Sequence, residues 1–126
     1  MGLITVQLTL SNPRRPEIEP VQTDALVDTG AVYLVIPERV QADLQLEEQS
    51  KKEVTLADGS RRLTAYVGPI ETRFKNRVAY VGAVVMGDEV LLGAIPMEDM
   101  DLILIPQQRI ADVNPNSPNV ASAKVK

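Results

Sequence analysis

The chain contains neither histidine nor cysteine among its 126 residues. Their absence excludes Ser-His-Asp and Cys-His nucleophiles, thiolate chemistry, disulfide bonds and zinc sites built on Cys or His. The side chains that remain for chemistry are mainly carboxylates, hydroxyls, Lys and Arg. A chain without cysteine suits any compartment, so this absence does not indicate the redox environment.

Aromatic residues are scarce as well. There is no tryptophan, and the aromatic residues are Tyr33, Tyr66, Phe74 and Tyr80. A hydrophobic core must therefore be built from Val, Leu, Ile, Ala and Met, and the share of β-branched types favours a β-sheet. With 126 residues, of which 44% are hydrophobic, the chain fits one compact domain and is too short for two lobes of ordinary size.

Basic clusters and long apolar runs are also missing. The formal net charge is −4, and the adjacent basic residues form isolated pairs. This pattern argues against a nucleic acid or an anionic membrane as a partner. The first five residues lack the features of a signal peptide, and no run approaches the roughly 18 apolar residues of a membrane span. We therefore expect a soluble, cytoplasmic protein.

The first third of the sequence predicts a β-hairpin followed by a short helix. Residues 4–10 alternate between apolar and polar types, which is typical of a strand with one buried face. A turn with two prolines follows, and the chain returns in an apolar run that ends at Asp28. After a predicted strand over residues 32–36, Pro37 begins a segment with the pattern of a helix up to Leu44.

The remaining two thirds predict further strands. Residues 53–86 predict antiparallel strands, with a hairpin turn at Asp58-Gly59 and a break at Gly68-Pro69. Apolar runs at 90–92 and 102–105, one or two helical turns at 94–100 and a weaker strand at 109–113 follow. We expect one mostly β domain with two short helices over residues 1–113, and a disordered C-terminal tail over residues 114–126.

The segment most informative about function is Ala-Leu-Val-Asp-Thr-Gly-Ala at residues 25–31. It predicts a buried strand that delivers Asp28 into a tight turn, after which the chain re-enters the core. A carboxylate held between two buried strands is a candidate for acid–base chemistry. The alternative is an ordinary turn in which Asp28 bonds only to its own backbone.

This segment, together with Val-Leu-Leu-Gly at residues 90–93 and the short helix that follows, resembles the retropepsin-like aspartic proteases. The resemblance spans roughly residues 5–113 in the order of elements and implies a closed β-barrel, the acid-protease fold. It also implies an aspartic endopeptidase that needs no cofactor or metal. Because only one Asp-Thr-Gly is present, the second carboxylate would come from Asp28 of a second copy in a homodimer that binds a peptide or protein substrate.

The resemblance also implies a role for individual residues. Asp28 would be the catalytic general acid and base, and Thr29 would form a hydrogen bond across the two-fold axis. Gly30 would allow backbone and substrate to approach closely. The other residues expected to support the loop are Ala31, Leu92 and Gly93. The hairpin tip expected to be the substrate-binding flap is Ala57, Asp58, Gly59 and Ser60. The first strand and residues 109–113 would join the two subunits.

Three alternatives to this function remain open at the level of the sequence. The chain could be a non-catalytic dimeric or peptide-binding module of the same fold. It could also be a structural β-domain with a chance Asp-Thr-Gly turn and a solvent-exposed Asp28. Two acidic clusters, Asp88-Glu89 and Glu98-Asp99 with Asp101, could hold a hard cation, but neither has the spacing of a calcium loop.

Overall fold

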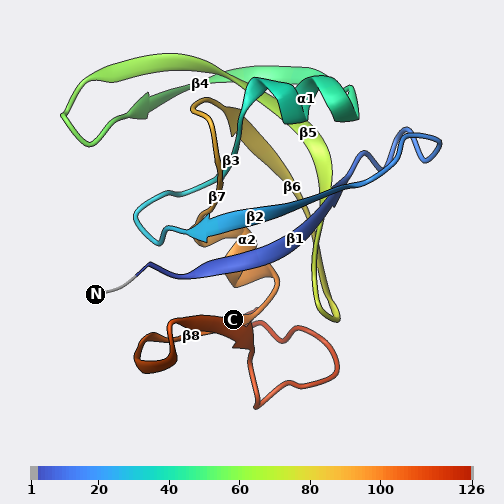
Figure 1. Ribbon diagram of the computed structural model, residues 1–126, viewed down its shortest axis with the longest axis vertical. Coiled ribbons are helices and arrows are strands. Elements are labelled where there is room, and N and C mark those ends of the chain that lie inside the picture. The colour runs from blue at the N-terminus through green and yellow to red at the C-terminus, as the bar shows by residue number, and fades with distance from the viewer. Residues whose placement is uncertain (1–2, 126) are drawn as a thin grey trace.

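The computed structural model describes residues 3–125 (Figure 1). Strands make up nearly half of this part of the chain, and the other regular elements are two α-helices and one 3₁₀ turn. In chain order the elements are β1 (Thr5–Ser11), β2 (Val21–Val27), β3 (Leu34–Ile36), α1 (Glu38–Leu44), β4 (Glu48–Thr55), β5 (Arg61–Phe74), β6 (Arg77–Val85), β7 (Val90–Leu92), α2 (Ala94–Asp99), β8 (Leu102–Ile105), η1 (Pro106–Gln108) and β9 (Ile110–Val113).

The main sheet closes into a barrel. Its strand order is β1-β2-β7-β3-β6-β5-β4, and β1 also pairs with β5, so six strands form a ring and β4 extends from β5 outside it. Closure leaves the ring without an open edge. The expected mostly β, closed-barrel fold with two short helices is confirmed.

Alternating sequence patterns explain the barrel core. Along β1 the apolar side chains of Val6, Leu8 and Leu10 are buried, while the intervening polar ones face outward. Helix α1 buries Val40 and Leu44 against the barrel, and its last turn ends at Gln45 in the left-handed conformation. No helix among residues 3–125 has the length and apolar character needed to cross a bilayer.

Three strands differ from the sequence prediction. β4 starts at Glu48, five residues before the predicted run of strands at 53–86. β5 does not break at Gly68-Pro69 but runs from Arg61 to Phe74, with a register shift against β6 between Val67 and Ile70. Pairing with β4 and β6 on its two sides holds the strand together where local sequence favours a break. β3 is also shorter than expected, because residues 32 and 33 belong to the loop after Asp28.

The tail, for which the sequence predicts disorder, forms hydrogen bonds with the domain over residues 114–122. No helix or strand follows Val113 in the described residues, but the segment lies against the domain through hydrogen bonds to Asp101. Its donors are Asn114 Nδ2, Ser117 Oγ and the Ser122 backbone N–H. These bonds to the charged carboxylate lower the pKa of Asp101 to about 2. The segment has few apolar residues, and its polar groups instead bond it to Asp101.

Candidate active site

Strand pairing brings two distant segments to one edge of the barrel. β2 and β7 are parallel, with Val27 opposite Leu92, so their carboxyl ends lie side by side. Asp28 directly follows β2, and its backbone N–H donates to the Leu92 carbonyl at 3.0 Å. The Asp-Thr-Gly and Leu-Leu-Gly segments that the sequence singles out are therefore neighbours in space.

The loop of residues 28–33 is held by hydrogen bonds from within and from α2. The Gly30 N–H donates to Asp28 Oδ1 at 3.0 Å, which orients the carboxylate, and the Ala31 N–H donates to the Asp28 carbonyl at 3.1 Å. From the start of α2, the Ala94 N–H donates to the Ala31 carbonyl at 2.8 Å and the Ile95 N–H to the Val32 carbonyl at 2.9 Å. The loop therefore has little freedom to move relative to the barrel.

Gly93 is required at its position by close packing. A Cβ atom there would lie 2.8 Å from the Ala31 carbonyl oxygen and 2.9 Å from the Tyr33 carbonyl carbon, and both are backbone atoms. At Gly30 a Cβ would lie 3.2 Å from Asp28 Oδ1. Glycine thus lets the two segments meet at Gly93 and leaves room for the carboxylate at Gly30.

Asp28 lines a cleft of about 820 Å³. Asp28 is half-buried in the single chain, and its side chain accepts a hydrogen bond from the backbone of its own turn. The cleft is bounded by the loop after Asp28, by the arm of β4 and by the β6–β7 turn. Lining residues other than Asp28 are Gly30, Ala31, Val32, Tyr33, Val35, Glu53, Val54, Thr55, Leu56, Ala57, Val84, Met86, Gly87, Asp88, Glu89 and Leu91.

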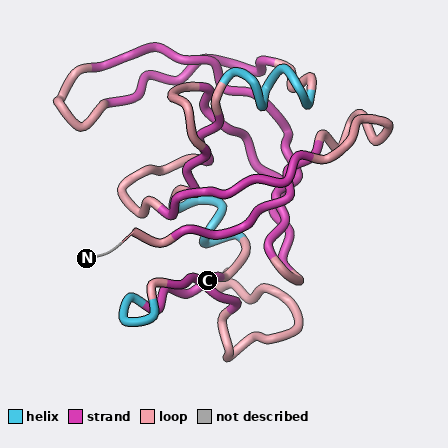
Figure 2. Tube along the Cα trace, viewed as in Figure 1, coloured by secondary structure: helices cyan, strands magenta, loops and turns pink. Residues whose placement is uncertain are grey.

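A hairpin covers this cleft. Residues 48–64, here called the flap hairpin, project to the same side of the barrel as the loop of residues 28–33 (Figures 1 and 2). At its tip, Asp58 Oδ1 accepts hydrogen bonds from the Ser60 N–H at 2.9 Å and the Ser60 hydroxyl at 2.6 Å, which lower the pKa of Asp58. Gly59 adopts a φ of +85° that the tight turn requires.

Of the four expected flap residues, only Ala57 lines the cleft. Asp58, Gly59 and Ser60 are exposed at the tip. Thr29 is exposed too, and Ala31 and Leu92 supply the carbonyls that accept hydrogen bonds from Ala94 and Asp28.

The sequence does not predict two walls of the cleft, residues 53–56 at the end of β4 and residues 86–89 in the β6–β7 turn. The apolar period-two pattern of Val54 and Leu56 was a signal for the first wall. For the second wall, the sequence predicts a turn at residues 87–89, with a cation site at Asp88 and Glu89 as an alternative, and does not predict that it lines the cleft. Among residues 3–125, no group of three or more His, Cys, Asp or Glu side chains could hold a metal ion.

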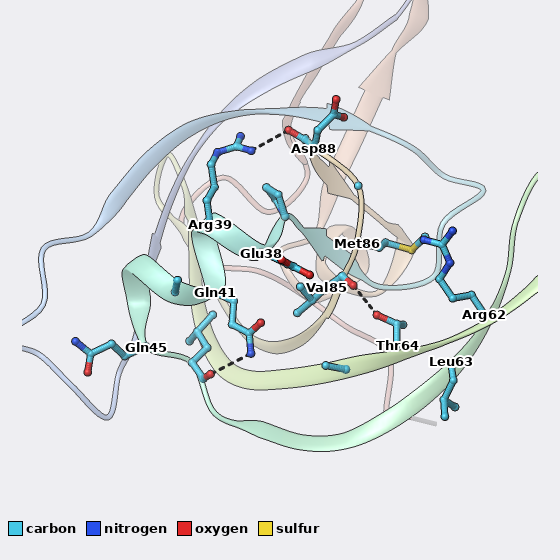
Figure 3. Close-up of a pocket in the computed structure, with 15 residues that line it drawn as sticks. Glu38, Arg39, Gln41, Gln45, Arg62, Leu63, Thr64, Val85, Met86 and Asp88 are labelled. Carbon is cyan, nitrogen blue, oxygen red and sulfur yellow. Dashed lines mark hydrogen bonds between the residues drawn. The ribbon is translucent and has the colours of Figure 1, made fainter.

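A second cavity of about 900 Å³ shares residues 86–88 with the Asp28 cleft as part of its lining (Figure 3). It is bounded by α1, the start of β5 and the same turn, and Arg39 Nη1 donates to the Asp88 carbonyl at 3.1 Å on its rim. Asp28 does not line it. Although this cavity is slightly larger, it lacks a carboxylate held at the junction of two strands, so the Asp28 cleft is the better candidate active site.

Comparisons with known proteins identify the family and the fold of the chain. A family model described as aspartyl protease matches residues 16–94, which include the loop at Asp28, the flap hairpin and Gly93. A solved structure of EIAV protease complexed with the inhibitor HBY-793 has the same fold, with a TM-score of 0.63 and 18% sequence identity over 82% of this chain and 93% of that chain. A search of curated proteins found no match.

Proposed function

The chain belongs to the retropepsin-like aspartyl proteases, and from this premise we propose that it is an aspartic endopeptidase that works as a homodimer. The observation that carries the proposal is the half-buried Asp28 carboxylate, which the Gly30 N–H orients at the floor of a cleft covered by the flap hairpin. The cytoplasmic location expected from the sequence stays a prediction.

Peptide hydrolysis at this site requires two carboxyl groups with different protonation states. Two carboxyl groups a few Å apart cannot both ionise, so one stays protonated while the other is charged. The charged group takes a proton from water, whose oxygen attacks the amide carbon, and the protonated group stabilises the carbonyl oxygen. Transfer of a proton to the amide nitrogen then breaks the carbon–nitrogen bond. One Asp28 can fill only one of these roles at a time.

The second carboxyl group is proposed to be Asp28 of a second copy across a two-fold axis. The single Asp-Thr-Gly of the sequence and the exposed position of Thr29 support this arrangement. A candidate contact surface is the small sheet of β8 and β9. All four residues of β8 are apolar and only half-buried in the single chain, and the sheet has two strands and thus open edges.

The cleft favours an extended peptide with apolar side chains beside the cleaved bond. Val32, Val35 and Leu91 line it on one side, and Val54 and Leu56 of the flap hairpin line it on the other. Apolar walls bury substrate side chains of this type and exclude water from the reacting groups.

The test is cleavage of a diverse peptide library by the wild type and by Asp28→Asn, measured by mass spectrometry from acid to neutral pH. We expect Asp28→Asn to keep fold and dimer while its cleavage rate falls on the order of 10³-fold or more, because acid–base catalysis contributes on this scale. Asp43→Asn, the same chemical change at an exposed position of α1, is the control and is expected to cleave like the wild type.

Two outcomes would contradict the proposal. Wild-type activity in Asp28→Asn would remove Asp28 from the mechanism. A monomeric wild type that cleaves nothing in the library would instead favour the non-catalytic peptide-binding module.

A further inference from the structure

Three side chains form a cluster where the flap hairpin meets the loop after Asp28. The ammonium group of Lys52, on β4, lies 4.8 Å from the ring centroid of Tyr66 and 5.6 Å from that of Tyr33. The two rings are 5.4 Å apart and meet edge to face at 63°. Both distances from Lys52 are within the range in which a cation is attracted to an aromatic face.

Lys52 has no competing partner in the part of the chain that the structure describes. Within residues 3–125, no carboxylate lies within ion-pair distance of its ammonium group. The neighbouring Lys51 differs, because it is exposed and pairs with Glu48 at 3.2 Å. Lys52, Tyr33 and Tyr66 are all half-buried, so water screens the contact less than it would at an exposed site.

Both rings are attached to fixed parts of the barrel. Tyr66 lies over Gly82 of β6, where a Cβ would come within 2.6 Å of Tyr66 Cε2. The Tyr33 backbone packs against Gly93, which precedes α2. Lys52 is therefore the member of the cluster on β4, the outer strand of the hairpin, and it contacts two aromatic rings that the barrel holds in place.

The cluster also lies at the root of the part of the hairpin that covers the cleft. Lys52 is opposite Thr64 of β5, and the Thr64 hydroxyl donates to the Val85 carbonyl on β6. Beyond this point, residues 53–57 line the cleft on the hairpin, and Tyr33 lines it on the loop after Asp28. A change in how Lys52 contacts the rings would thus change the position of the flap hairpin relative to Asp28.

We propose that Lys52 is a positioning residue that sets the closed position of the flap hairpin through its contacts with Tyr33 and Tyr66. The effect on hydrolysis rests on the proposed protease function, whereas the effect on the hairpin does not. The contact between Lys52 and Tyr33 links the flap hairpin to the loop of residues 28–33, which contains Asp28.

The primary test is hydrogen exchange of backbone amides in the full chain without substrate, followed by mass spectrometry of peptides spanning residues 53–63. Lys52→Met keeps much of the apolar stem and removes the charge, and we expect its hairpin amides to exchange roughly tenfold faster, as loss of a partly desolvated cation–π contact allows. Lys52→Arg keeps a cation over the rings and is expected to restore slow exchange. Lys51→Met removes the neighbouring exposed charge and is expected to match the wild type.

A second pair of variants changes the aromatic ring of Tyr33 instead of Lys52. Tyr33→Phe keeps the ring and is expected to preserve slow exchange, whereas Tyr33→Leu removes it and is expected to reproduce the effect of Lys52→Met. Hairpin exchange that is unchanged in Lys52→Met, or equally fast in Lys51→Met, would overturn the proposal. A fall in the midpoint of global unfolding that accounts for the faster exchange would also overturn it, because Lys52 would then be only a packing residue.

Kinetics provide the second readout. With a peptide that the wild type cleaves, Lys52→Met is expected to raise KM about fivefold to tenfold with a smaller change in kcat and an unchanged pH profile, since the hairpin holds substrate but donates no proton. A lower kcat at unchanged KM would overturn the positioning role. If the wild type cleaves no peptide, the protease proposal fails, and the exchange experiment still decides the role of Lys52.

Discussion

The most specific structural prediction concerns Gly93→Ala. The new methyl group would lie 2.8 Å from the Ala31 carbonyl oxygen and 2.9 Å from the Tyr33 carbonyl carbon, and backbone atoms cannot rotate away as a side-chain end can. The loop of residues 28–33 must therefore retreat. Overpacking of this kind costs about 1–3 kcal/mol. The retreat also weakens the bonds from Ala94 and Ile95 to the loop, each worth about 1 kcal/mol.

Together these effects predict a loss of about 3–5 kcal/mol in the free energy of unfolding. Urea unfolding at one fixed chain concentration measures it, and a slope of roughly 1–3 kcal/mol per molar urea converts the loss into a midpoint at least about 1 M lower. Gly87→Ala is the control: its Cβ would have nothing within 4 Å, although its φ of +72° costs about 1 kcal/mol with a side chain. A Gly93→Ala variant no less stable than Gly87→Ala would refute the close packing of Gly93 against the loop.

Further predictions concern the tail and the barrel wall. Asp101→Asn keeps a residue that tolerates the left-handed φ of 55° but removes the charge, and we expect the Ser122 amide to exchange faster at neutral pH. In the wild type the pKa of Asp101 is lowered to about 2, so the charged carboxylate holds the tail when the pH is above 3.8, its ordinary pKa, and releases it as the pH falls toward 2. The measurement is the protection factor of the Ser122 amide, which is its exchange rate relative to the intrinsic rate at each pH, and a protection factor that stays equally high at pH 2 would contradict this. Thr72→Val replaces a buried hydroxyl that has no hydrogen-bond partner among the described residues, and it should leave the free energy of unfolding unchanged or raise it by about 1 kcal/mol; a clear loss in the same urea assay would show that the hydroxyl is paired.

Local sequence signals predicted much of the fold. Period-two alternation identifies β1, Asp58-Gly59 marks the flap hairpin, and Pro37 precedes α1 as expected. Asp28 was found in the same way, because an apolar run that stops at Asp-Thr-Gly places a carboxylate at the end of a strand. Each of these signals depends on residues close together in the chain.

The features that local patterns do not predict depend on contacts between distant residues. The β1–β5 pairing that closes the barrel joins Leu10 to Thr72, and no local pattern specifies it. The cluster of Lys52 with Tyr33 and Tyr66 arises only when the hairpin folds over the loop. The hydrogen bonds of the tail are likewise not visible in local sequence: its low apolar content predicts disorder, while the structure shows bonds from this segment to Asp101.

The central claim, that two Asp28 carboxylates from two copies form one active site, is tested most directly by mixing subunits. Wild type and Asp28→Asn are unfolded together in varied ratios, refolded at constant total concentration and assayed for peptide cleavage. If one site needs both carboxylates, activity falls as the square of the wild-type fraction, because mixed dimers are inactive. Activity that falls in direct proportion to the wild-type fraction would contradict the account, since each chain would then act alone.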